Sequence, residues 1–133
     1  MLVNEIVAKG EALEVGGFRT GGVTIAGTEY MPPKWQSLDE RFNKAAIIDT
    51  DQLPVSAYRF FLKAARSQYF WDGNNPTGQL MMNGVLMSNG YLPATIAARH
   101  KLEYNKLMIP FYETGDTKEM ETFLKKNIPW PTE

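Results

Sequence analysis

The fold of this chain is decided by a stretch near its middle, where a polar turn leads into an apolar segment. The stretch reads Gln68-Tyr69-Phe70-Trp71-Asp72-Gly73-Asn74-Asn75-Pro76-Thr77-Gly78-Gln79. Its glycines and asparagines favour a turn, and the apolar residues that follow favour a helix. A helix start exposes unpaired backbone N–H groups and the positive end of the helix dipole. The stretch therefore predicts a helix start that can receive an anion.

The polar residues of this stretch are candidates for binding a charged ligand. Those around the expected helix start are the candidate nucleotide- or anion-binding residues: Gly73, Asn74, Asn75, Thr77 and Gln79. Asp72 stands at the mouth of the turn, where a carboxylate beside a phosphate usually holds a divalent cation. Taken alone, such turns more often begin ordinary helices that bind nothing.

Apolar spacing on both sides of the turn predicts a mainly helical protein. The clearest helix begins at Val55, because apolar residues recur there every three or four positions up to Tyr69. Further helices are expected at about 2–14, 35–48, 97–111 and 116–126. The helix at about 76–89 carries apolar residues around its whole axis, which is typical of the central helix of a bundle.

Residues 23–30, called the flap below, predict one small β-hairpin. Val23 and Ile25 would share one face, with a glycine at the turn. Two prolines, Pro32 and Pro33, would close the hairpin because proline cannot donate to a ladder. An exposed hairpin can pair with an extended peptide, so its edge is a candidate docking site: Thr24, Ile25, Ala26, Gly27 and Thr28.

Composition limits the classes of protein to which the chain can belong. Its 133 residues fit a single domain, 1–133, and 44% hydrophobic with 22% charged residues is an ordinary globular balance. A net charge of −1 argues against general binding of nucleic acid or an anionic membrane. The absence of cysteine excludes disulfides, and no stretch reads as a signal peptide or membrane span. We expect a cytoplasmic protein, and the sequence gives no indication of its oligomeric state.

The order of these parts resembles that of the Fic/Doc family. The family signature runs His-x-Phe-x-Asp/Glu-Gly-Asn-Gly/Lys-Arg, and the Fic branch continues to a second arginine three residues later. Phe70, Asp72, Gly73 and Asn74 match in register, and Gly78 agrees with the glycine often seen before that second arginine. Segments around residues 17–33 and 90–116 also follow the family order, so the resemblance covers nearly the whole chain.

The resemblance implies a Fic-type helical bundle around the helix at about 76–89, with the flap docking the target. It also implies ATP or a related nucleotide with magnesium, bound by the turn and the helix start. In that family the motif histidine deprotonates a hydroxyl, usually on a protein, which then attacks a phosphorus atom. Most members transfer AMP, whereas the Doc branch transfers a phosphoryl group.

The chain departs from this signature at four positions. Gln68 replaces the histidine, and Asn75 replaces the glycine or lysine. Pro76 and Gln79 replace the two arginines, which removes the forked donors suited to phosphate oxygens. A carboxamide cannot accept a proton near neutrality, and losing a general base costs about 10²–10⁴-fold in rate. No catalytic residue of the motif is therefore intact.

Two questions remain about the motif: whether Asn75 caps the helix, and whether another residue could act as the base. Asn75 followed by Pro76 is a strong helix start, which leads to the hypothesis that Asn75 caps the helix and occupies donors that an anion would use. His100 is the only histidine, and its basic neighbours Arg99 and Lys101 are typical of a solvent-facing residue rather than a base.

The sequence leaves three functions open. The first is a pseudo-AMP-transferase that acts by binding a protein target or a regulatory partner, with residual affinity for a nucleotide. The second is an active protein nucleotidyltransferase (AMPylase), or a Doc-like phosphotransferase, with an altered mechanism such as substrate-assisted deprotonation. The third is a structural or regulatory remnant that binds no nucleotide.

Overall fold

The computed structural model describes residues 17–127, and this part of the chain is mainly helical. Five α-helices follow one another there: α2 (Leu38–Ala45), α3 (Val55–Ser67), α4 (Asn74–Ser88), α5 (Lys101–Thr114) and α6 (Lys118–Lys126). Short 3-10 turns precede α2, α3 and α5, at Trp35–Ser37, Thr50–Gln52 and Ala98–His100. The helix expected at 2–14 lies outside the described residues. Within residues 17–127, every helix is too short or too polar to span a bilayer.

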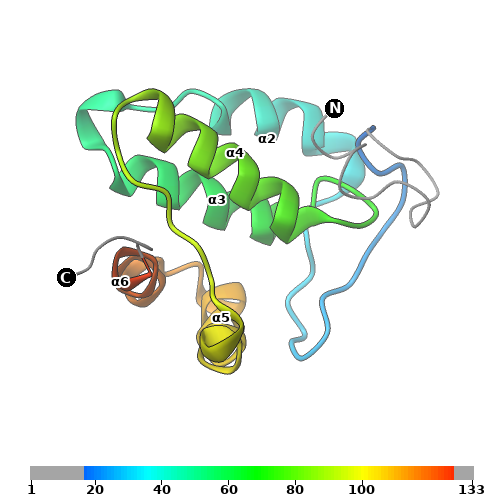
Figure 1. The fold of residues 1–133 in the computed structure, drawn as a ribbon. Helices are drawn as coiled ribbons and strands as arrows, with labels where there is room; N and C mark the ends of the chain where they lie inside the picture. The colour runs from blue at the N-terminus through cyan, green and yellow to red at the C-terminus, as the bar shows by residue number, and fades with distance from the viewer. Residues whose placement is uncertain (1–16, 128–133) are drawn as a thin grey trace.

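Helix α3 is the centre of the arrangement. Figure 1 shows α2, α3 and α4 from the side, with α5 and α6 seen nearly end-on beneath them. α3 contacts α2, α4 and α6, and eight of its residues are buried, from Ala57 to Ser67. The period of three and four residues in this segment predicted a helix, and that prediction is confirmed; burial extends beyond the predicted stripe because α3 contacts three other helices.

Helix α4 lies close to its predicted position, but the prediction that it is central is wrong. Met82 and Leu86 are fully buried against the core, whereas Leu80 is 55% and Met87 61% exposed. Neighbouring helices cover one side of α4 because the centre of the bundle is occupied by α3. Apolar residues around a whole helix axis therefore did not mean burial around the whole axis.

The flap is an extended excursion rather than the predicted β-hairpin. None of residues 23–30 lies in a strand, although the chain reverses at Gly27, whose φ of 87° is the left-handed region that favours glycine. No strand ladder joins the two arms of residues 23–30, and they contact the helices: Ile25 packs against the main core, and Thr28 Oγ1 donates to Glu113 Oε2 of α5 (3.2 Å). Two such short arms are marginal as an isolated ladder, so contacts with the helices determine their course.

A buried arginine ties both ends of the flap to the end of α3. Arg19 is 1% exposed, and its guanidinium donates to the carbonyls of Gly21 (2.7 Å) and Pro33 (2.5 Å), on either side of the flap. It also donates to the carbonyls of Ser67 (3.3 Å) and Gln68 (2.5 Å) at the negative end of α3. Burial lowers the pKa of Arg19, but these acceptors satisfy the charged group.

Gly78 lets α4 approach α3 closely, and this gives a first testable prediction. A Cβ at Gly78 would lie 3.0 Å from Cδ1 of the fully buried Phe61, whereas one at Gly84 of the same helix would meet nothing within 4 Å. We expect Gly78→Val to lower the free energy of unfolding by about 1–3 kcal/mol through overpacking. The matched control Gly84→Val should change it by less than about 0.5 kcal/mol. Urea unfolding measures both, and equal effects would contradict the close approach.

Candidate functional site

A hollow of about 490 Å³, called the flap hollow below, opens between the flap and the start of α4. Its wall consists of Thr24, Ile25 and Ala26 of the flap, Gln68, residues 71–76, and Tyr112 of α5. We call residues 71–76 the motif turn. The structure thus brings together the flap and the motif turn, two segments that the sequence separates by more than forty positions.

Four of the residues predicted from sequence do not line the flap hollow. Thr77 is 1% exposed, and its backbone N–H donates to the Gly73 carbonyl (3.0 Å) as part of the helix. Gln79 lies two residues beyond Thr77 along α4. Gly27 and Thr28 lie further out on the flap, against Ile109 and Glu113 of α5.

Gln68, which the resemblance aligns with the motif histidine, uses both ends of its amide within the protein. The residue ends α3 in the left-handed region, with φ 51° and ψ 62°. Its Nε2 donates to the Ala65 carbonyl (2.6 Å), and its Oε1 accepts a hydrogen bond from Asn74 Nδ2 (3.1 Å). The side chain therefore holds the loop in shape, and it offers the hollow no group that titrates near neutrality.

The side-chain amide of Asn74 stabilises the motif turn through hydrogen bonds with the backbone of Phe70. Its Oδ1 accepts from the Phe70 backbone N–H (2.9 Å), and its Nδ2 donates to the Phe70 carbonyl (2.8 Å). Asn74 is nearly fully buried, which is possible because its amide is hydrogen-bonded. The amide of Asn74 therefore stabilises the turn, and both its oxygen and its nitrogen are hydrogen-bonded within the protein.

The hypothesis that Asn75 caps α4 is wrong. The helix begins at Asn74, Gly73 takes the cap position with φ 71°, and Pro76 is the third helical residue rather than the first. The side chain of Asn75 instead donates from Nδ2 to Tyr104 Oη of α5 (3.0 Å). Tyr104 is deeply buried, and this burial raises the pKa of its hydroxyl. Asn75 thus joins α4 to α5 and does not occupy the donors of the helix start.

The charge on the wall of the flap hollow comes from one carboxylate. Asp72 lines it and accepts the Gly73 backbone N–H at Oδ1 (2.8 Å). No lysine, arginine or histidine of residues 17–127 lines this wall. A bound phosphate would therefore meet the positive end of α4 but no cationic side chain. His100 lies elsewhere, at the start of α5, where its Nε2 accepts from Arg99 Nε (3.2 Å).

A divalent cation fits this site only together with a ligand. No three acidic, histidine or cysteine side chains within residues 17–127 are grouped so that they could hold a metal. Mg²⁺ is commonly bound by one or two carboxylates together with waters and the phosphates of a substrate. Asp72 could supply the carboxylate, and a nucleotide would have to supply the rest.

Some residues that shape the site were not predicted from sequence. Arg19 anchors the flap, but a single arginine beside glycines gives no sign that it will be buried. Trp71 lies over Gly21, where a Cβ would come within 2.7 Å of the indole ring. Tyr112 completes the wall from α5, and burial raises the pKa of its hydroxyl. The buried stripe of α5 was the signal that could have placed it.

A comparison of the sequence with protein-family models found no match.

Proposed function

We propose that the chain is a Fic-type module that has lost the chemistry of group transfer and acts by binding a protein partner along its flap. The observation that carries this proposal is the flap hollow itself, in which the flap and the motif turn face each other. The hollow would also bind a nucleotide with Mg²⁺. The flap backbone would hold the protein partner, and the start of α4 would hold the nucleotide.

The proposed loss of group transfer is supported by two features: the flap hollow has no general base at Gln68 and no cationic side chain on its described wall. Transfer to a target hydroxyl needs a group that accepts its proton and donors that spread the charge of the phosphates. Gln68 is neutral and engaged with Ala65 and Asn74. The described wall has no cationic side chain to act on a phosphoryl group.

A protein partner is supported by the exposure and shape of the flap. Thr24 and Ala26 are exposed, while Ile25 between them packs inward and anchors the segment. Within the described residues, this extended stretch pairs with no other strand. An extended peptide can add to such a segment through backbone hydrogen bonds, with alternate side chains entering the adjacent hollow.

A nucleotide with Mg²⁺ is supported by Asp72 and the start of α4. The carboxylate would hold the cation, and backbone N–H groups of the first helical turn would face the phosphates. The metal would supply positive charge that no side chain of the described wall provides. Because no cationic side chain of the described wall contacts the phosphates, the affinity for the nucleotide should be low.

Photo-crosslinking through the flap tests the binding proposal. We expect a photoreactive amino acid at the exposed Ala26 to give a specific protein adduct in lysate, whereas the same group at Lys125 of α6 gives none. Successive N–H groups of an extended segment point to opposite edges. One of Val23→Pro and Thr24→Pro, but not both, should therefore abolish the Ala26 adduct. An adduct that survives both substitutions, in variants with unchanged thermal unfolding, would contradict docking along the flap.

A further inference from the structure

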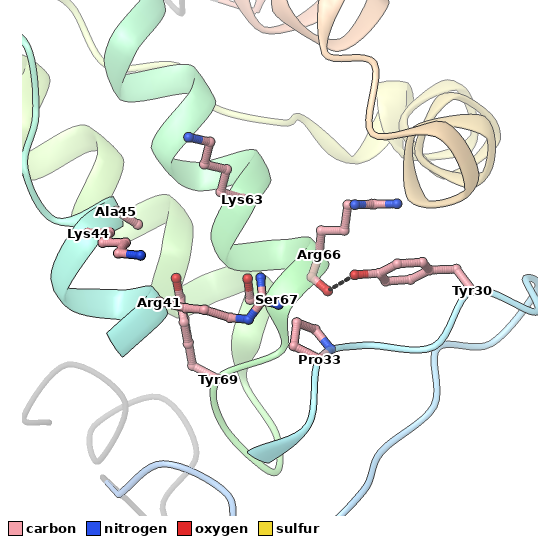
Figure 2. A pocket seen from close by; sticks show the side chains of 9 residues that line it. All are labelled: Tyr30, Pro33, Arg41, Lys44, Ala45, Lys63, Arg66, Ser67 and Tyr69. Carbon is pink, nitrogen blue, oxygen red and sulfur yellow. Dashed lines mark hydrogen bonds between the residues drawn. The ribbon is translucent and has the colours of Figure 1, made fainter. Parts of the chain in front are cut away.

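A second hollow of about 310 Å³, called the basic hollow below, lies between α2 and α3. Figure 2 shows the nine side chains that line it, which come from these two helices, from Tyr69, from Tyr30 at the end of the flap, and from Pro33 just after the flap. Four of them are cationic: Arg41, Lys44, Lys63 and Arg66. The described wall contains no aspartate or glutamate. This gathering of positive charge occurs in a chain whose net charge is −1.

The four cations differ in how far they are engaged. Arg66 points away from the others in Figure 2, toward Tyr30, whose ring centroid lies 4.2 Å from its guanidinium carbon; its Nε donates to the Tyr112 carbonyl (3.0 Å). Lys44 pairs with Glu40 at 3.4 Å on the exposed rim. Lys63, in contrast, makes no ion pair with any residue of the described part of the chain.

Arg41 also retains donors that a ligand could use. Its Nε donates to Ser37 Oγ (3.0 Å), and this bond uses one of the five N–H donors of a guanidinium. Its charge acts on the neighbouring Tyr69 hydroxyl: burial raises the pKa of Tyr69, while the Ser67 hydroxyl and Arg41 oppose that rise. Arg41 and Lys63 are thus the cations best placed to meet an anion.

Two hydroxyl groups complete the chemistry of this wall. Ser67 and Tyr69 are buried residues that line the hollow beside the cations. A neutral hydroxyl donates a hydrogen bond to an anion, and a guanidinium or ammonium adds a charge-assisted one. Phosphate oxygens accept from both kinds of donor, whereas a cationic or apolar ligand would leave the positive charges unbalanced.

We propose that the basic hollow binds a small phosphate-bearing anion, such as a phosphorylated metabolite. Its volume lies at the lower end of the range for ligand sites, about 300–1,000 Å³, which fits one or two phosphates with a small organic group. This site is separate from the flap hollow, whose wall carries Asp72 and, among the described residues, no cation. The proposal goes beyond the function proposed above and does not depend on it.

Titration of the ¹⁵N-labelled chain with sodium pyrophosphate, followed by amide chemical shifts, tests the proposal. We expect saturable shifts in residues 41–45 and 63–69, together with weaker binding as chloride is raised. Arg41→Gln and Lys63→Gln should each weaken the binding about ten-fold, because each removes a charge-assisted hydrogen bond. Lys125→Gln, which removes an exposed lysine from α6, is the matched control and should leave it unchanged.

The outcomes separate clearly because both altered residues are exposed and their variants should fold. Absence of saturable shifts in these two segments would overturn the proposal. So would shifts confined to residues 72–77, which would place the anion at the start of α4. An equal loss of affinity in Lys125→Gln would show that the effect is general charge and not this hollow.

Discussion

Arg19→Met is expected to lower the free energy of unfolding by about 3–5 kcal/mol, the largest effect on stability that we expect from a single substitution. Methionine approximates the length of the side chain but donates no hydrogen bond. The carbonyls of Gly21, Pro33, Ser67 and Gln68 would lose the group that now joins them. Hydrogen bonds to a charged group contribute about 1.5–3 kcal/mol each, and the loss leaves the buried carbonyl of Ser67 without this partner. Urea unfolding followed by circular dichroism measures the loss.

The control for this variant is Arg99→Met. Arg99 is exposed, and its Nε bonds to the neighbouring His100, so its loss should change stability by less than about 0.5 kcal/mol. A loss below about 1 kcal/mol for Arg19→Met would mean that the buried guanidinium does not hold the flap to α3.

Repair of the motif is expected to give the largest gain in activity. The variant combines Gln68→His, Asn75→Gly, Pro76→Arg and Gln79→Arg, and should transfer nucleotide at least about 10²-fold faster than the natural chain. Histidine supplies the missing base at the end of α3, and it tolerates the left-handed backbone found there. Pro76→Arg places a cation on the wall of the flap hollow, which has none among its described residues, and Gln79→Arg adds a second cation further along α4. Incorporation of labelled nucleotide into protein measures the gain.

A matched control carries the other three substitutions and keeps Gln68. It should remain inactive if the missing base limits the reaction, and activity in this control would assign the gain to the arginines. No gain in the full variant, with its fold confirmed by circular dichroism, would show that the hollow itself has diverged from a transfer site.

Helix positions could be read from sequence where the apolar spacing is regular. The spacing from Val55 to Tyr69 located α3, and the polar turn indicated a start of α4 at Pro76, two residues beyond its actual start at Asn74. Local signals sufficed here because each reflects backbone preferences of a few neighbouring residues.

Tertiary contacts decided the features that the sequence did not reveal. Asn75 has the local chemistry of a cap, but Tyr104, 29 positions away, takes its amide. The flap has the alternation of a hairpin, but its arms contact α3 and α5: Tyr30 Oη donates to the Arg66 carbonyl (3.2 Å), and Thr28 bonds to Glu113. The basic hollow likewise joins residues of two helices whose spacing along the chain carries no motif.

We propose that the flap hollow binds its ligands without transferring a group between them. The most direct measurement incubates the natural chain with labelled ATP, Mg²⁺ and lysate proteins, and uses mass spectrometry to count nucleotide-modified residues. We predict no modification above that in the same lysate without the chain, because Gln68 cannot accept a proton. Modification of a protein hydroxyl that depends on the chain and is lost on its removal would contradict the claim.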